Sequence, residues 1–223
     1  MRTFIFFLAF LSFSCNDDNE PVDIVEESPQ LVVILYDISK SIDSYGILKN
    51  QHLGQLYDRI AFSGGGKVYA YHIKSNSLKQ EAIEFQITAV DTLRYRGNRY
   101  QNEIAEKKNK EILQKAQIDK SKFIEAIGTQ LILPKEEGYT DIENALKLAE
   151  VTLEQVEFKV WDKHLIIISD GIHDIRGGLA EDSFEPVQFS DVNIIMVRAS
   201  KHHFIEGSSP VLTNTISDAI NNL

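Results

Sequence analysis

An aspartate and two serines follow a run of apolar residues near the start of the chain. The run Leu31–Tyr36 leads into Asp37, and Ser39 and Ser41 come next at alternate positions. One carboxylate and two hydroxyls are hard oxygen ligands of the kind that Mg²⁺ or Mn²⁺ prefers. The pattern therefore predicts a divalent cation at the end of a strand.

Two more polar residues stand at comparable places later in the chain. Thr140 precedes a helical pattern, and Asp170 follows a second apolar run, Leu165–Ile168. In an open α/β sheet the carboxyl ends of the strands share one crevice, so residues far apart in the sequence can converge there. We therefore expect Thr140 and Asp170 to lie beside the first aspartate.

Together these residues resemble the metal ion-dependent adhesion site of von Willebrand factor type A domains. That site combines Asp-x-Ser-x-Ser with a distant Thr and a distant Asp, and the chain fills all five positions in the same order. The matching residues are Asp37, Ser39, Ser41, Thr140 and Asp170. The resemblance implies that the serines and the threonine bind the metal directly, while the aspartates act mainly through water. It also implies a partner protein whose Asp or Glu carboxylate completes the coordination of Mg²⁺ or Mn²⁺.

Each of these residues also has a purely structural interpretation. Ser39 and Ser41 are suited to cap a following helix, and Thr140 with Glu143 forms the pattern of a capping box. Asp170, followed by glycine, is typical of a turn after a strand. The joint pattern in chain order favours the metal site over these separate explanations.

The alternative enzyme class is the haloacid dehalogenase-like phosphohydrolases, which also begin with an apolar strand that ends in a catalytic aspartate. Asp170 and Asp174 suit the later Mg²⁺-binding motif of that class. Its first motif, however, needs a second carboxylate as general acid. The chain has Ser39 there, and a serine cannot do this work near neutral pH. We therefore predict a binding module rather than an enzyme, and a metal-independent envelope scaffold is the remaining alternative.

The N-terminus has the pattern of a bacterial lipoprotein signal. Residues 1–14 contain one cation, a short apolar core and small residues, which is too short to span a bilayer. Cys15, the only cysteine in the chain, stands where a lipobox places the lipidated residue. Ser12 and Phe13 depart from the usual lipobox, so a plain signal peptide is the alternative. The acidic, proline-containing residues 15–29 are typical of a tether. We expect a lipid-anchored protein of the bacterial cell envelope, at the outer membrane.

Residues 30–223 have the size and pattern of one α/β domain. The formal net charge of −10 argues against nucleic acid as a partner and against attraction to an anionic membrane, so the lipid is the expected membrane contact. Apolar runs alternate with helical patterns, which predicts a doubly wound, mostly parallel sheet flanked by helices, with one antiparallel edge strand.

The expected strands and helices follow from these patterns. Strands are expected at 31–37, 67–74, 82–90, 163–169 and 192–197, and helices at 42–60, 98–127, 141–157 and 214–223. Apolar and polar residues alternate in 82–90, which predicts that one face of this strand is exposed to water, as at the edge of a sheet. Residues 202–206 are the candidate for a sixth strand. The segment 98–127 is predicted to extend a helix beside the metal face and to influence the choice of partner.

Overall fold

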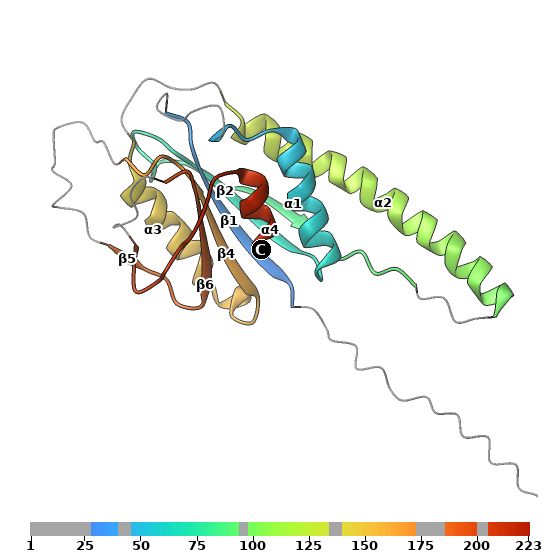
Figure 1. Cartoon of the computed structure of the whole chain (residues 1–223). Coiled ribbons are helices and arrows are strands. Elements are labelled where there is room, and N and C mark those ends of the chain that lie inside the picture. The colour runs from blue at the N-terminus through green and yellow to red at the C-terminus, as the bar shows by residue number, and fades with distance from the viewer. Residues whose placement is uncertain (1–27, 40–45, 94–97, 134–139, 173–185, 200–204) are drawn as a thin grey trace, which may run out of the picture.

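A six-stranded sheet with the order β3-β2-β1-β4-β6-β8 forms the centre of the molecule (Figure 1). The computed structural model describes residues 28–39, 46–93, 98–133, 140–172, 186–199 and 205–223. All strand pairs in this sheet are parallel except β2 with β3 at one edge. The strands are β1 (Gln30–Asp37), β2 (Gly66–Ile73), β3 (Ile83–Ile87), β4 (Asp162–Ile168), β6 (Val192–Val197) and β8 (Val211–Thr213). The predicted fold class is confirmed.

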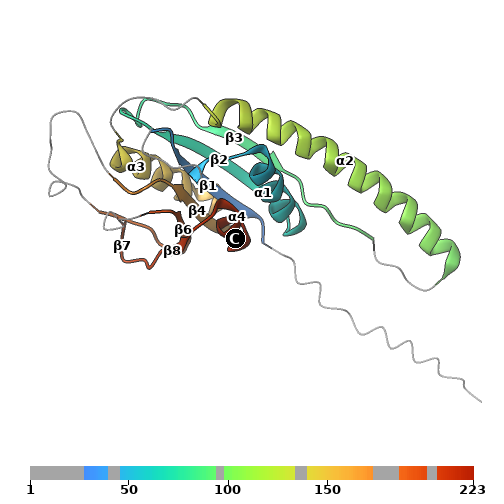
Figure 2. The same ribbon diagram turned by 45° about the horizontal axis from the view of Figure 1, so that its top comes forward.

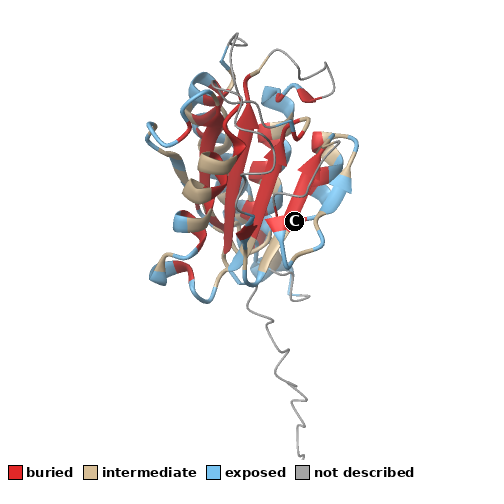
Figure 3. Cartoon of the chain, turned by 90° about the vertical axis from the view of Figure 1, so that its left-hand side faces the viewer, coloured by how far each residue is buried: buried red, intermediate tan, exposed pale blue. Residues whose placement is uncertain are grey.

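β1 is the central strand, and every one of its residues is buried (Figure 3). Successive side chains point to opposite faces of a strand, so an uninterrupted apolar run belongs where both faces are covered. Val32, Ile34 and Tyr36 join the hydrophobic cluster on one face of the sheet. Leu31, Val33 and Leu35 join a separate cluster on the other face.

Helices cover both of these faces. The helices α1, α2 and α4 contribute to the first cluster, and α3 contributes to the second. Their bounds are α1 (Asn50–Phe62), α2 (Arg99–Leu131), α3 (Ile142–Leu153) and α4 (Ile216–Asn221), and a single 3₁₀ turn (Val156–Phe158) follows α3. This two-sided covering is the doubly wound arrangement that the sequence predicts.

α2 is a single helix of 33 residues, about 50 Å long at the usual rise. It begins at an N-cap, Asn98, whose side chain accepts hydrogen bonds from two backbone amides of the first turn. Its C-terminal half buries Phe123, Ile127 and Leu131, while its N-terminal half extends past the body of the domain (Figure 2). The extending half lies away from the strand ends that carry Asp37, whereas the C-terminal end of α2 reaches the end of β2, where the ring Nε2 of His72 lies 3.1 Å from the carbonyl of Leu131.

Two other predicted elements differ from the structure. The sixth strand of the sheet is β8, not the segment 202–206. Within that segment, β7 (Ile205–Glu206) pairs instead with β5 (Val187–Gln188) in a separate two-stranded sheet. The first helix begins at Asn50, later than the apolar spacing predicts.

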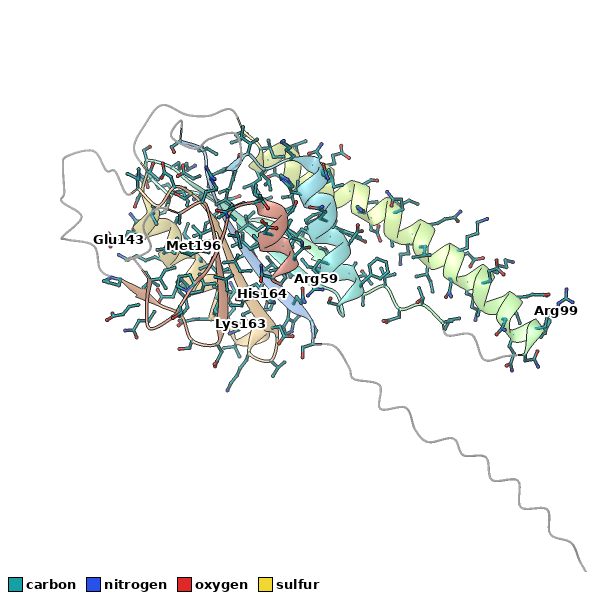
Figure 4. All side chains as sticks on the ribbon, in the orientation of Figure 1. Arg59, Arg99, Glu143, Lys163, His164 and Met196 are labelled. Atoms are coloured by element: carbon teal, nitrogen blue, oxygen red, sulfur yellow. The ribbon has the colours of Figure 1, made fainter. Side chains whose placement is uncertain are left out.

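His164 is a buried base on β4. The amide Nδ2 of Asn193 lies 3.3 Å from its Nδ1, and its Nε2 has no hydrogen-bond partner among the described residues. Burial lowers the pKa of His164 below its ordinary value of 6.5; the carboxylate of Asp162 opposes this shift and the guanidinium of Arg59 adds to it (Figure 4). The folded domain therefore holds His164 neutral.

This burial predicts a loss of stability in mild acid. Below about pH 6.5 the unfolded chain binds a proton at His164 that the folded chain does not, so the free energy of unfolding should fall until the lowered pKa is reached. The variant His164→Gln should lose this part of the pH dependence, and the wild type measured in parallel is the reference. Chemical denaturation at about pH 7.5 and about pH 5.5 measures it. An unchanged pH dependence in His164→Gln would contradict the prediction.

Candidate metal centre

Asp37 is the last residue of β1, and its side chain is fully buried. The backbone amide of Ser39 donates to its Oδ1 at 2.7 Å, and the hydroxyl of Ser169 donates to its Oδ2 at 2.8 Å. Burial raises the pKa of the Asp37 carboxyl above its ordinary 3.8, hydrogen bonds from Ser39 and Ser169 counteract this, and the charge of Asp170 raises it further. A nearby cation would relieve both the burial and the like charge.

Ser39 follows the last residue of β1 by two positions and is half-buried. Its position is tied to Asp37 by the amide hydrogen bond described above. It does not cap the following helix, because the N-cap of α1 is Lys49. The capping interpretation of Ser39 is therefore wrong for α1. Ser41, the second serine of the motif, lies outside the described residues.

Asp170 follows β4, the neighbour of β1 in the sheet. Its Oδ1 accepts a hydrogen bond from the amide of Ile172 at 3.0 Å, which closes a turn at Gly171. Gly171 has φ of 78°, a conformation that favours glycine. The predicted turn at Asp170–Gly171 is confirmed. The same turn holds the Asp170 carboxylate close enough to Asp37 to raise the pKa of the Asp37 carboxyl.

Ser169 was not predicted as a site residue. It is buried, and its hydroxyl donates to Asp37 while accepting from the amide of Gly171 at 3.1 Å. Ser169 therefore joins the end of β1 to the turn after β4. The signal in the sequence was a polar residue placed after four apolar ones and directly before the aspartate.

Thr140 is buried and lies just before α3. The predicted capping box of Thr140 with Glu143 is wrong. Asp141 is the N-cap, and its side chain accepts from the amide of Asn144 at 3.2 Å. Glu143 instead forms an ion pair with Lys147 at 2.6 Å. The N-cap of α3 thus lies one residue later than predicted, and Thr140 precedes it.

The backbone holds the Thr140 segment against the strand ends. The amide of Asp141 donates to the carbonyl of Lys74 at 3.2 Å, directly after β2. The buried Ser77 hydroxyl lies 2.9 Å from the carbonyl of Asp141 and 3.1 Å from that of Lys74. The amide of Ile38 in turn donates to Ile73, the last residue of β2. The ends of β1, β2 and β4 thus place Asp37, Ser39, Thr140 and Asp170 at the same edge of the sheet.

The donor set at this edge fits a hard divalent cation. It consists of hydroxyls and carboxylates, with Asp37 already occupied by two hydrogen bonds and so suited to orient other ligands. The part of the chain that the structure describes contains no cluster of three or more His, Cys, Asp or Glu side chains. The hydroxyls of Ser39 and Thr140 are ligands of another type. The N-terminal signal, Cys15, Asp174 and the tether as far as residue 27 lie outside the described residues, so their roles stay predictions.

No described helix is both long enough and apolar enough to cross a membrane. No family model matches the chain, and no curated protein matches it.

Solved structures do resemble the chain. One is the "SpRpn10 VWA domain", with 12% identity and a TM-score of 0.41, covering 88% of this chain and 95% of that one. Another is the conserved hypothetical protein BatB from Bacteroides thetaiotaomicron, with 18% identity and a TM-score of 0.33, covering 75% and 66%. The assignment of the fold rests on the sheet itself. The strand order β3-β2-β1-β4-β6-β8, with one antiparallel edge strand and helices on both faces, gives this chain a doubly wound, Rossmann-like fold.

Proposed function

We propose that this domain binds a protein partner through Mg²⁺ or Mn²⁺ held at the carboxyl ends of β1, β2 and β4. The observation that carries the proposal is the fully buried Asp37 carboxylate, tied to Ser39 and Ser169 beside a second carboxylate, Asp170. A fully buried carboxylate beside a like charge is unfavourable without a compensating cation. A divalent ion at this edge would supply that compensation.

The residues at this edge would have two different roles. Ser39, Ser41 and Thr140 would hold the cation, while Asp37 and Asp170 would orient these ligands and balance the charge. The bound cation would supply a positive centre for an Asp or Glu carboxylate of the partner, an interaction that is charge-assisted and directional. A single acidic residue of the partner could then anchor the interface.

The burial of Asp37 also favours a binding role over the phosphohydrolase alternative. A nucleophilic aspartate must present an oxygen to the phosphorus atom of its substrate. Both oxygens of Asp37 already accept hydrogen bonds, and the side chain is fully buried. Ser39 offers no general acid beside it. The proposal therefore includes no catalytic activity.

The proposal also includes attachment to the cell envelope through a lipid on Cys15, with the acidic residues 15–29 as the tether. Its support is the sequence pattern alone. Metabolic labelling of the cells with a radioactive fatty acid tests it, because Cys15→Ser should abolish the label on this protein.

Calorimetric titration of Mg²⁺ and Mn²⁺ tests the metal site. Thr140→Ala should weaken binding at least about tenfold, because it removes a proposed direct ligand while leaving both carboxylates in place. Thr152→Ala is the matched control, since Thr152 is also a buried threonine and lies in the last turn of α3, far from the helix start that Thr140 precedes. It should bind the metal as the wild type does.

Two outcomes would count against the proposed metal site. Binding that is unaffected by Thr140→Ala would favour the phosphohydrolase alternative, which does not need this threonine. An absence of binding, together with partner assembly that resists EDTA, would favour the metal-independent scaffold.

A further inference from the structure

Exposed apolar side chains surround the point where the chain enters the sheet, at the end opposite the metal centre. Phe62, the last residue of α1, is 54% exposed, and Val156 and Val160, between α3 and β4, are 88% and 80% exposed. Trp161 lies next to them and is half-buried. We name these four residues the basal rim.

Hydrogen bonds fix the basal rim around the start of β1. The amide of Gln30 donates to the carbonyl of Gly65 at 2.9 Å, just after α1. The amide of Asp162 donates to the carbonyl of Pro29 at 3.0 Å, just after Trp161. The two segments that carry the rim are thus bonded to the two residues at which the N-terminal segment joins the domain, and Figure 1 shows β1 beginning between them.

The rim residues are exposed although their neighbours are packed. Phe158 is buried, with its ring 4.9 Å from that of Trp161 and 6.0 Å from that of Tyr69. This aromatic cluster gives Val156 and Val160 a firm base, so their exposure comes from the fold and not from a loose end. Exposed apolar groups of this kind commonly mark a contact with a partner or a membrane.

The charge around the rim suits an electrically neutral surface. Two acidic residues, Glu157 and Asp162, and two basic residues, Lys159 and Lys163, lie between positions 156 and 163, so this segment has no net charge in a chain of −10. A tryptophan beside apolar side chains and lysines is a combination that favours the interface between lipid and water.

We infer that the basal rim rests on the lipid surface to which the N-terminal segment is attached. The inference rests on the proposed lipid at Cys15, because the 15 residues from there to Gln30 reach at most about 50 Å. Such a tether keeps the rim at a high effective concentration near the bilayer, so a weak contact is enough to hold it there. The rim adds a second membrane contact to the one that the sequence predicts.

The chain carries its own reporter for this contact, because Trp161 is the only tryptophan and Cys15 the only cysteine. The full chain can be coupled through Cys15 to phosphatidylcholine vesicles that contain a maleimide lipid. This coupling makes the attachment independent of lipidation in the cell. Phosphatidylcholine brominated on its acyl chains then quenches Trp161 only if the rim meets the bilayer.

Quenching of Trp161 by brominated vesicles, relative to unbrominated ones, is the expected result. The double variant Val156→Asp, Val160→Asp should reduce the docked fraction about tenfold or more, because both positions would then bring charge to the lipid. Leu212→Asp, at an exposed position of β8, is the control and should be quenched like the wild type. The far-ultraviolet circular dichroism of each variant verifies folding.

Two results would overturn the inference. The first is wild-type Trp161 that stays unquenched on brominated vesicles while coupled to them. The second is a shift of Trp161 emission that follows protein concentration without vesicles, which would assign the rim to a second copy of the chain. Calorimetric titration of Mg²⁺ into the same coupled sample measures the affinity of the metal site separately. Failure of the rim and failure of the metal site are therefore distinguishable.

Discussion

Asp37→Asn should weaken Mg²⁺ binding about 10- to 100-fold, the range typical of residues that orient metal ligands. The amide keeps the shape of the carboxylate but removes its charge. Its oxygen can still accept from the amide of Ser39, and its NH₂ group can donate to the hydroxyl of Ser169. The variant therefore isolates the charge of Asp37 from its role in packing.

The same variant should be at least as stable as the wild type when the metal is removed. The pKa of Asp37 is raised in the folded protein by burial, so at neutral pH the charged form is less favourable there than in the unfolded chain. An asparagine carries no such penalty. Thermal unfolding in EDTA measures this stability, and calorimetric titration measures the affinity.

Asp58→Asn is the matched control for charge, because Asp58 is a half-buried acid on α1 that pairs with Lys120 on α2 at 2.5 Å, away from the strand ends. It should leave the affinity for Mg²⁺ unchanged. Wild-type affinity in Asp37→Asn would refute the assignment of the metal centre. A strong loss of stability in EDTA would instead mean that the carboxylate supports the fold.

Phe123→Ala should destabilise the domain by about 3–5 kcal/mol, the range for removing a fully buried phenylalanine. Phe123 is on α2, and its ring lies 5.8 Å from that of Tyr57 on α1 and 5.3 Å from that of Phe85 on β3. It therefore joins three elements at once. The substitution leaves a cavity in the contact that holds the long helix to the sheet.

Ile118→Ala tests whether the effect belongs to this contact. Ile118 is on the same helix but is 58% exposed, so its loss should change the stability by less than about 0.5 kcal/mol. Urea denaturation measures both variants. A small effect of Phe123→Ala would mean that α2 contributes little to the stability of the domain.

Most of the sheet could be predicted from the sequence because its strands are buried on both faces. Continuous apolar runs such as Leu31–Tyr36 and Leu165–Ile168 have few other structures open to them in a domain of this size. β8 has no such run: Val211 and Leu212 are exposed, and the strand has only three residues. It is held by pairing with β6, which a local pattern does not reveal.

The site could be predicted in its main residues but not in its connections. Asp37 and Asp170 were found because each follows a buried strand. Ser169 was missed because its partner, Asp37, lies 132 residues away, and only the parallel register of β1 and β4 brings them together. The cap of α3 was placed one residue early because Thr140 and Asp141 are both good N-caps, and the contacts of the segment with β2 decide between them.

The position of β1 has a mechanical consequence. The strand runs from the end where the N-terminal segment joins the domain to Asp37 at the opposite edge, and it is hydrogen-bonded along its length to β2 on one side and β4 on the other. Tension between a partner at the metal centre and the N-terminal segment would pull β1 lengthwise past both neighbours. Its eight residues would then share the force in shear, so the bonds on both sides would have to break together rather than one at a time.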